Sequence, residues 1–361
     1  MIDTALKKIR IAVLLGGASN EREISLESGR NVSYKLSPQK YETTVLFVDT
    51  ELQLFAIPAK LLVRNTTREI QDALTPDMKV LWNDLPKLFD FVFIALHGGA
   101  GENGFIQGTL EMLGLPYNGS GVLASALCMD KYKTNEFLKN KGFDIPEHWL
   151  VAQGDSLELS EAAYPLIVKP FDDGCSVMVH KVNNHQELQA ACTTIFANNK
   201  THALVEEFIK GMELTVGVMG NEHPVALPPS QTVATAGILS IEEKFLPGAG
   251  ENQTPAPLAQ AALDFVRGVI AQVYQSVGCK GYARIDCFYQ TAEQSKTGKE
   301  RVVILEINTL PGLTPATCIF HQAAEIGMRP ADFLDMIIQL GFEKNTQQAC
   351  LSVEQQKFLQ S

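Results

Sequence analysis

Residues 302–308 read Val-Val-Ile-Leu-Glu-Ile-Asn and are followed by Thr-Leu-Pro-Gly. This run of β-branched and apolar residues predicts a buried strand. Because side chains alternate across a strand, Glu306 and Asn308 share one face. A carboxylate and an amide on a buried strand cost free energy unless a partner compensates them. The stretch therefore indicates a binding site built on a core strand.

A second strand of the same kind is predicted about twenty residues upstream, where 281–289 read Gly-Tyr-Ala-Arg-Ile-Asp-Cys-Phe-Tyr. Arg284 and Asp286 are two residues apart and therefore share a face. The polar run 290–300 predicts a hairpin loop, which sets the two strands side by side and antiparallel. Asp286, Glu306 and Asn308 then lie together as oxygen ligands suited to Mg²⁺, with the arginine beside them. Either strand alone is better explained as a half-exposed sheet face; the two together favour a metal site.

The composition sets the broad class of the protein. A chain of 361 residues predicts two or three domains, and 45% apolar with 20% charged residues is typical of a globular protein. A net charge of −11 argues against nucleic-acid and anionic-membrane binding, so local cations must hold any polyphosphate. The seven cysteines are scattered and favour a reducing cytosol over a disulfide framework or a zinc site. No stretch has the length of a signal peptide or a transmembrane helix, so we expect a cytoplasmic protein.

The first third of the chain predicts a parallel α/β sheet. Strands at 9–15, 43–48 and 91–96 alternate with helical stretches such as 68–74, whereas 50–87 as a whole show no clear pattern. After the first strand, Gly-Gly-Ala-Ser-Asn-Glu predicts a turn into a helix that begins at Ser19 or Asn20. This turn lacks Gly-x-Gly-x-x-Gly, which argues against a nicotinamide dehydrogenase. The glycine-rich run 97–104 indicates either backbone that approaches a ligand or a flexible turn.

The middle of the chain contains features suited to phosphate. Lys131 lies in a predicted helix over 125–140 and alone would be read as a solvated lysine. Lys169 ends an apolar strand and precedes a proline and the loop Phe-Asp-Asp-Gly-Cys-Ser-Val, whose backbone N–H groups could hold phosphates. Further strands are predicted at 204–209 and 213–218 and helices at 105–113, 256–277 and 330–340. The helix at 256–277 has an apolar stripe that predicts cover for a sheet. We assign no function to the polar tail 341–361.

The order of these motifs resembles the ATP-grasp fold and, within it, the D-alanine–D-alanine ligase family. The family-like stretches are 16–26, His97-Gly98, 101–104, 118–126 with Met129-Asp130-Lys131, and 306–312, so the resemblance spans about residues 9–341. It implies an α/β (α+β) architecture in which an N-terminal parallel domain precedes two α+β domains that clamp ATP. The expected boundaries are 1–119, 120–209 and 210–341, followed by the tail 342–361.

The resemblance also implies a reaction and its participants. ATP phosphorylates the carboxylate of one D-alanine, and the amine of a second attacks the acylphosphate, giving a peptidoglycan precursor. Two anions must meet, so cations are required. The resemblance implies that two Mg²⁺ or Mn²⁺ ions are among them. The implied cations for phosphate are Lys131, Lys169 and, from a covering loop, Lys244. The implied metal ligands are Asp286, Glu306 and Asn308.

Further roles follow from the same resemblance. Adenine and ribose are expected at Glu206, Glu207, Phe208, Ile209 and Glu213, and nucleotide contact also at Asn308. Arg284 and the Gly312 N–H are expected to stabilise the acylphosphate and the oxyanion. Glu21 is expected to bind the first D-alanine's ammonium, with His97 nearby and Thr317, in place of a serine, at the second carboxylate. Ser176 of the phosphate loop is expected to act in catalysis.

Three positions depart from the family pattern. Cys175 replaces a serine, Met178 replaces a glycine, and Glu243-Lys244-Phe245 replaces Ala-Lys-Tyr. The tyrosine and the serine of relatives are hydrogen-bonded partners that lead to the glutamate placed at Glu21, but phenylalanine has no hydroxyl and cysteine is a weak donor. Because the tyrosine-to-phenylalanine change marks relatives that accept D-lactate, relaxed acceptor choice is a second hypothesis.

Two other functions are alternatives to D-Ala-D-Ala synthesis. One is a ligase of the same fold that joins D-alanine to D-lactate or another acceptor. The other is a nucleotide-binding regulator without chemistry, which has no need to keep Arg284, Asp286, Glu306 and Asn308 together. The expected partners are the small molecules D-alanine and ATP and, as is common in the family, a second copy of the chain.

Overall fold

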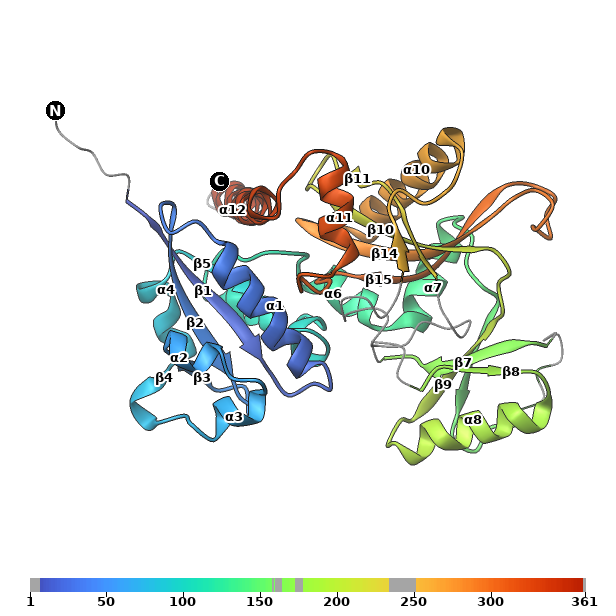
Figure 1. Ribbon diagram of the computed structural model, residues 1–361, viewed down its shortest axis with the longest axis horizontal. Coiled ribbons are helices and arrows are strands. Elements are labelled where there is room, and N and C mark those ends of the chain that lie inside the picture. Colours follow the sequence, from blue (N-terminus) through green and yellow to red (C-terminus); the bar gives the residue numbers. More distant parts are fainter. Residues whose placement is uncertain (1–6, 158, 160–163, 173–177, 234–250, 360–361) are drawn as a thin grey trace.

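A computed structural model describes residues 7–157, 159, 164–172, 178–233 and 251–359, and Figure 1 shows its three β-sheets. The first sheet has the order β4-β3-β2-β1-β5, the second β6-β9-β7-β8, and the third β13-β12-β10-β14-β15 with β11 paired to β10. In the figure the first sheet lies at one end of the molecule, and the other two lie together at the opposite end.

The first sheet confirms the predicted parallel arrangement at its centre. β1 (Ile9–Gly16) pairs in parallel with β2 (Tyr41–Val48) and β5 (Phe91–Ile94). Its edge is antiparallel, through β3 (Leu54–Ala56) and β4 (Lys79–Val80). Its helices are α1 (Arg22–Lys35), α2 (Ala59–Leu62), α3 (Thr67–Gln71), α4 (Leu85–Leu88) and α5 (Phe105–Met112). The short turns are η1 (Pro76–Met78), η2 (Trp82–Asp84) and η3 (Gly99–Gly101).

In this part the structure corrects one prediction and describes one stretch that the sequence left open. α1 begins at Arg22, later than the predicted start at Ser19 or Asn20. The Ser19 hydroxyl donates to the His97 carbonyl at 2.6 Å and accepts the Glu21 N–H at 3.1 Å, so it fixes the turn that precedes the helix. The stretch 50–87 showed no pattern because its elements are two to five residues long, too short for a period to appear.

The second sheet consists of β6 (His148–Ala152), β7 (Leu166–Pro170), β8 (His180–Val182) and β9 (His202–Glu207), with α8 (His185–Ala197) packed on it. It is preceded by α6 (Val122–Met129) and α7 (Lys131–Asn140). A single helix over 125–140 was predicted, and this is wrong. Asp130 has φ −92° and ψ 97°, outside the helical region, and its side chain accepts the Lys133 N–H at 2.9 Å as the cap of α7.

The third sheet contains β10 (Met212–Met219), β11 (Val225–Ala226), β12 (Ser230–Val233), β13 (Glu251–Gln253), β14 (Tyr282–Gln290) and β15 (Arg301–Asn308). α10 (Gln260–Val277) covers one face with buried residues at helical spacing, among them Leu263, Val266, Ile270 and Val273. This confirms the predicted apolar stripe. α11 (Cys318–Glu325) and α12 (Pro330–Leu359) complete the chain.

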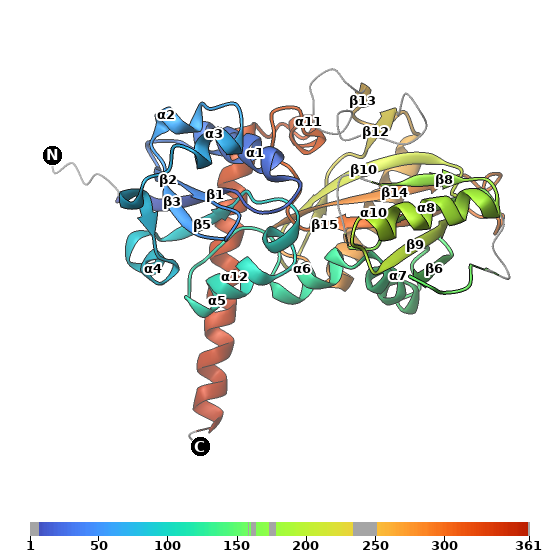
Figure 2. The same ribbon diagram turned by 90° about the horizontal axis from the view of Figure 1, so that it is seen from below.

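α12 is longer than predicted. It was expected to end at Leu340 but continues to Leu359, and Figure 2 shows its last part extending away from the sheets. Gly341 does not end the helix; it allows close packing, because a Cβ atom there would lie 2.6 Å from both the Tyr117 carbonyl oxygen and the Phe91 ring. Phe342 then packs on Phe91 with 5.1 Å between ring centroids. The last helix therefore completes the core of the first sheet.

One turn further on, α12 buries a lysine. Lys344 is 5% exposed, and its Nζ donates to the Gly119 carbonyl at 3.0 Å and lies 3.4 Å from the centre of the Tyr117 ring. The Tyr117 hydroxyl in turn donates to Glu111 at 2.7 Å. Burial lowers the pKa of Lys344 to about 7, although the charge of Glu111 acts in the opposite direction.

We predict that Lys344→Met changes how stability depends on pH. Between the folded pKa of about 7 and the unfolded value of 10.5, the unfolded chain binds the proton and the folded chain does not, so this lysine makes wild-type stability rise with pH. The free energy of unfolding of the variant minus that of wild type should therefore be about 2 to 3 kcal/mol larger at pH 6 than at pH 9, so that the variant is relatively more stable at the lower pH. Urea unfolding at both pH values measures this; a difference that is the same at both would contradict it. Lys141→Met, at an exposed lysine 5.6 Å from the Phe137 ring centre, is the control.

Candidate active site

The β14–β15 hairpin has the predicted arrangement. Its strands are antiparallel, with Arg284 opposite Asn308 and Asp286 opposite Glu306. The opposite side of β14, including Ile285 and Cys287, belongs to the core under α10. The polar face of the hairpin therefore points away from α10, as the alternation of residue types predicted.

A β-bulge, not foreseen from the sequence, adjusts this face. Asp286 pairs with Glu306 but Cys287 pairs with Ile304, which leaves Leu305 as the additional residue. The bulge changes the phase of the alternation, so that Ile304 and Ile307 both join the α10 core while Glu306 stays on the polar face. The strand can thus bury its apolar residues and still present its carboxylate.

Arg284 is the central cation of the polar face. Its Nε donates to Asp286 Oδ1 at 3.0 Å, one terminal nitrogen donates to Oδ2 at 2.9 Å, and the same nitrogen lies 3.7 Å from Glu306. The Thr215 hydroxyl of β10 also donates to Asp286, at 2.9 Å. Burial alone would lower the pKa of Arg284, but the charges of Asp286 and Glu306 outweigh it and the pKa lies above its usual value. The guanidinium is therefore permanently charged and rigidly held.

Lys131 approaches the same face from the start of α7. Its Nζ lies 3.3 Å from Glu306, and its backbone N–H donates to the Phe171 carbonyl, just beyond β7, at 2.9 Å. Burial would lower the pKa of Lys131, but the charges of Glu306 and Glu206 outweigh it and raise the pKa. This lysine is therefore charged and part of the site, not a solvated surface residue. A small pocket beside it is lined by residues that include Glu102, Met129, Glu306 and Asn308.

Lys169, at the end of β7, forms a buried ion pair with Glu206 of β9. Lys169 Nζ lies 2.6 Å from Glu206 Oε2, and Asn135 of α7 donates to Oε1 at 3.1 Å. The two predicted phosphate-binding lysines therefore share one acidic neighbour, since Glu206 also acts on Lys131. The predicted contact of Glu206 with the nucleotide stays a prediction.

The other residues expected at adenine and ribose lie where the chain passes from β9 to β10. Glu207 forms an ion pair with Lys296, Lys181 Nζ lies 3.9 Å from the centre of the Phe208 ring, and Ile209 is buried. Glu213 lies in β10, paired in register with Phe288. The structure thus brings these residues to the connection between the second and third sheets, and their nucleotide contacts stay predictions.

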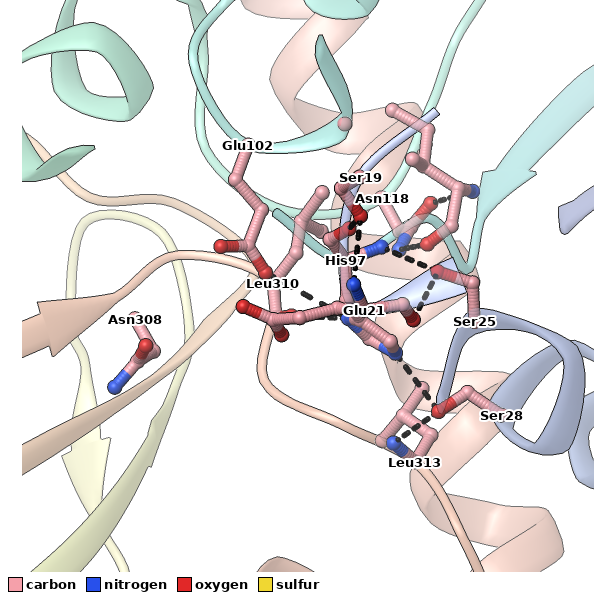
Figure 3. Close-up of polar contacts among 12 residues, drawn as sticks. Ser19, Glu21, Ser25, Ser28, His97, Glu102, Asn118, Asn308, Leu310 and Leu313 are labelled. Carbon is pink, nitrogen blue, oxygen red and sulfur yellow. Dashed lines mark hydrogen bonds and ion pairs between the residues drawn. The ribbon is translucent and has the colours of Figure 1, made fainter. Parts of the chain in front are cut away.

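The expected site for the first D-alanine lies against the first sheet. Glu21 precedes α1, and a Cβ atom added to Gly98, which has φ +66°, would lie 3.3 Å from its carboxylate. Glycine at 98 therefore lets the glycine-rich loop approach Glu21 closely. Figure 3 shows the side chains of Glu21 and Glu102 extending toward the side of His97 on which Asn308 lies.

His97 is buried, and both of its ring nitrogens have partners. Nδ1 lies 3.0 Å from the Leu310 carbonyl, and Nε2 lies 2.7 Å from the Ser28 hydroxyl. Nδ1 also lies 3.6 Å from Glu102. Glu102 belongs to the family-like stretch 101–104, but the sequence predicted no role for it. The only sequence signal for Glu102 was an acidic residue within a glycine-rich loop. His97 therefore connects the first sheet to the chain that follows β15.

The remaining residues that the sequence predicted for the site lie as follows. Gly312 is buried in the segment after β15, and Thr317 is 2% exposed, with its hydroxyl 3.0 Å from that of Thr314. Met178 has φ +58°, a conformation that favours glycine, the residue that the family resemblance led us to expect there. Cys175, Ser176, Lys244 and Phe245 lie outside the residues that the structure describes.

The donor set on the hairpin fits a hard divalent cation. Among the described residues no three or more His, Cys, Asp or Glu side chains form a metal-binding group. The predicted ligands instead combine two carboxylates with the Asn308 amide, whose nitrogen lies 3.4 Å from Glu306. Oxygen donors of this kind suit Mg²⁺, which takes its remaining ligands from water and substrate phosphates.

Comparison with known proteins identifies the family. A family model described as the D-ala D-ala ligase N-terminus matches residues 10–120, and one described as the C-terminus matches residues 138–339. The chain belongs to the D-alanine–D-alanine ligase family. The D-alanine–D-alanine ligase of Desulforudis audaxviator is 36% identical over 93% of this chain and 99% of its own length. The D-alanine–D-alanine ligase of Desulfotalea psychrophila is 35% identical over 96% of this chain and 98% of its own length.

Solved structures of this family are also similar to the chain. The D-alanine–D-alanine ligase of Coxiella burnetii superposes with a TM-score of 0.82 at 26% identity, over 98% of this chain and 99% of that one. The VanG D-Ala:D-Ser ligase of Enterococcus faecalis superposes with a TM-score of 0.79 at 26% identity, over 93% of this chain and 100% of that one. As a member of the D-alanine–D-alanine ligase family, the chain has the ATP-grasp fold and is a ligase, and membership implies ATP and Mg²⁺.

Proposed function

We propose that this chain joins two D-alanines into D-alanyl-D-alanine, with ATP converted to ADP and phosphate. The observation that supports it most directly is the polar face of the hairpin, where Arg284 and Lys131 surround the carboxylates of Asp286 and Glu306. Such an arrangement suits a reaction that must bring a phosphate and a carboxylate together. A protein that only binds nucleotide need not keep all of these charged groups together.

The chemistry follows from the charges. The carboxylate oxygen of the first D-alanine attacks the γ-phosphorus of ATP, and the bond to the β-phosphate oxygen breaks to release ADP. The uncharged amine of the second D-alanine then attacks the acyl carbon to form a tetrahedral oxyanion. The C–O bond to phosphate breaks, and the proton that the amine loses leaves with the phosphate or passes to solvent. Arg284 stabilises the charge on the transferring group, and the Gly312 N–H donates to the oxyanion. Positioning of the two substrates supplies much of the rate.

Substrate binding is divided between the sheets. Glu21 binds the ammonium of the first D-alanine, and Thr317 donates to the carboxylate of the second. Lys131, Lys169 and Lys244 hold phosphates, and Ser176 acts in catalysis. Asp286, Glu306 and Asn308 hold Mg²⁺ or Mn²⁺, two ions in our proposal, which neutralise phosphate charge when bound.

The domains and the setting belong to the same proposal. We place the boundaries near residues 119, 209 and 341, and we propose a cytoplasmic homodimer. Light scattering after gel filtration would show a mass twice that of the 39.6 kDa chain. Within the described residues, no helix is both long and apolar enough to cross a membrane.

A product assay tests the activity directly. Purified protein with ATP, Mg²⁺ and D-alanine should release phosphate and yield D-alanyl-D-alanine by mass spectrometry, whereas L-alanine should yield neither. D-Lactate and D-serine, offered together with D-alanine, measure the acceptor choice that Cys175 and Phe245 put in question. We expect D-alanyl-D-alanine to predominate. Phosphate release that is independent of D-alanine would contradict the proposal. A predominant ester product would show that D-lactate, and not D-alanine, is the preferred acceptor.

A further inference from the structure

The segment that follows β15 is held by side chains from α1 and from the loop after β5. His97 contacts the Leu310 carbonyl at 3.0 Å, and Asn31 Nδ2 donates to the Leu313 carbonyl at 2.7 Å. The Leu313 N–H donates to the Ser28 hydroxyl at 3.0 Å, as Figure 3 shows. These bonds join residues more than 200 positions apart in the chain. They fix the backbone on both sides of Gly312.

The hydrogen bonds form a consistent set. A carbonyl oxygen can only accept, so His97 Nδ1 carries the proton that reaches Leu310. The Ser28 oxygen accepts from Leu313, which leaves its own proton for His97 Nε2 at 2.7 Å. The imidazole therefore links the Leu310 carbonyl to the Ser28 hydroxyl within one hydrogen-bonded network. Ser28 is 0% and Asn31 7% exposed, so both side chains make these contacts inside the protein.

Helix α1 carries both of these side chains and is seated firmly. Ser28 and Asn31 are three residues apart and so lie on one face of the helix. Between them, Gly29 packs directly on β1, because a Cβ atom there would lie 2.6 Å from Leu15 Cβ. The same helix begins immediately after Glu21. One rigid element thus connects the residue expected at the substrate ammonium with the segment that contains Gly312.

We propose that Ser28 and Asn31 are positioning residues of the ligation. By holding Leu313, they set the place of the Gly312 N–H relative to the amino acid bound at Glu21. This inference rests on the proposed function, since it needs Glu21 and Gly312 in the roles given above. An oxyanion donor works only within a few tenths of an ångström of its place, so these buried side chains contribute to the rate without touching a substrate.

The experiment compares Asn31→Ala, Ser28→Ala and their double variant with Ser33→Ala. Ser33 lies on the same helix but donates only to the Gly29 carbonyl of its own turn. Asn31→Ala and Ser28→Ala should lower kcat about tenfold to a hundredfold, with KM for ATP within twofold of wild type. The double variant should lose less than the product of the single losses, because both bonds hold one segment. Ser33→Ala should match wild type.

A second readout separates positioning from general stability. A phosphinate dipeptide that mimics the tetrahedral oxyanion should lose affinity by the same factor as kcat. The inference would be overturned if Asn31→Ala and Ser28→Ala had the same kcat and the same phosphinate affinity as Ser33→Ala. It would also be overturned if the fraction of unfolded protein at the assay temperature accounted for the whole loss of activity. Should Asn31→Ala not fold, Ser28→Ala alone decides. Failure of the wild-type protein to cleave ATP with D-alanine would instead refute the proposed function.

Discussion

Glu306→Gln is expected to remove most Mg²⁺-dependent turnover while the protein stays folded. Glutamine has nearly the same shape, so the core beneath β15 is kept, but the charge that faces Lys131 at 3.3 Å and Arg284 at 3.7 Å is lost. A neutral amide is a poor ligand for a hard cation and leaves two buried cations with less compensation. We expect kcat to fall at least about a hundredfold at moderate Mg²⁺.

Phosphate release at increasing Mg²⁺ measures this effect. If the lost charge acts through the metal, the Mg²⁺ concentration needed for half-maximal phosphate release should also rise. Glu300→Gln is the matched control, because Glu300 lies at the exposed end of the same hairpin, where it accepts from the Tyr289 hydroxyl. Undiminished turnover in Glu306→Gln would refute the metal assignment.

Arg284→Lys should have an effect of similar size. Arginine donates to both oxygens of Asp286 through two nitrogens, and a lysine can reproduce the charge but not this forked geometry. One Asp286 oxygen would lose its partner in a buried environment, so we expect stability to fall by about 1 to 3 kcal/mol. We expect kcat to fall about a hundredfold or more, because the cation no longer holds its place at the transferring group.

The matched variant is Arg301→Lys on the same hairpin. Arg301 donates to Gln290 and lies 3.4 Å from Asp144, at the end of β15 away from Glu306. It should keep activity within about twofold, in line with the small effects of most partly exposed substitutions. Equal losses in Arg284→Lys and Arg301→Lys, measured by kcat and by thermal unfolding, would show that the forked bond has no special role.

The hairpin could be predicted because its chemistry repeats with a period of two. Arg284, Asp286, Glu306 and Asn308 stand out on apolar strands, and a loop of the right composition joins them. The bulge at Leu305 could not be predicted, since it depends on which residues the α10 core accepts. The break at Asp130 was missed for a related reason: no glycine or proline marks it, and a side-chain cap decides it.

The buried contacts between distant segments were also beyond the sequence. Lys169 and Glu206 were each assigned to ATP, and nothing in the sequence indicated that they pair with each other at 2.6 Å. The bonds of Ser28 and Asn31 to Leu313 join α1 to a segment more than 280 residues away. Such pairings follow from how the sheets are placed, which composition and periodicity do not encode. Resemblance to a family indicated the ligands of the site but not the residues that hold them in place.

The packing of α12 on the first sheet has a consequence for synthesis of the chain. Phe91 and Tyr117 acquire the cover of Gly341, Phe342 and Lys344 only after residues 118–340 have been made. Until then, the nascent first sheet exposes part of its apolar interior, a state in which newly made proteins tend to associate wrongly. A gene shortened to remove the glutamine-rich end should therefore retain the codons through at least Thr346.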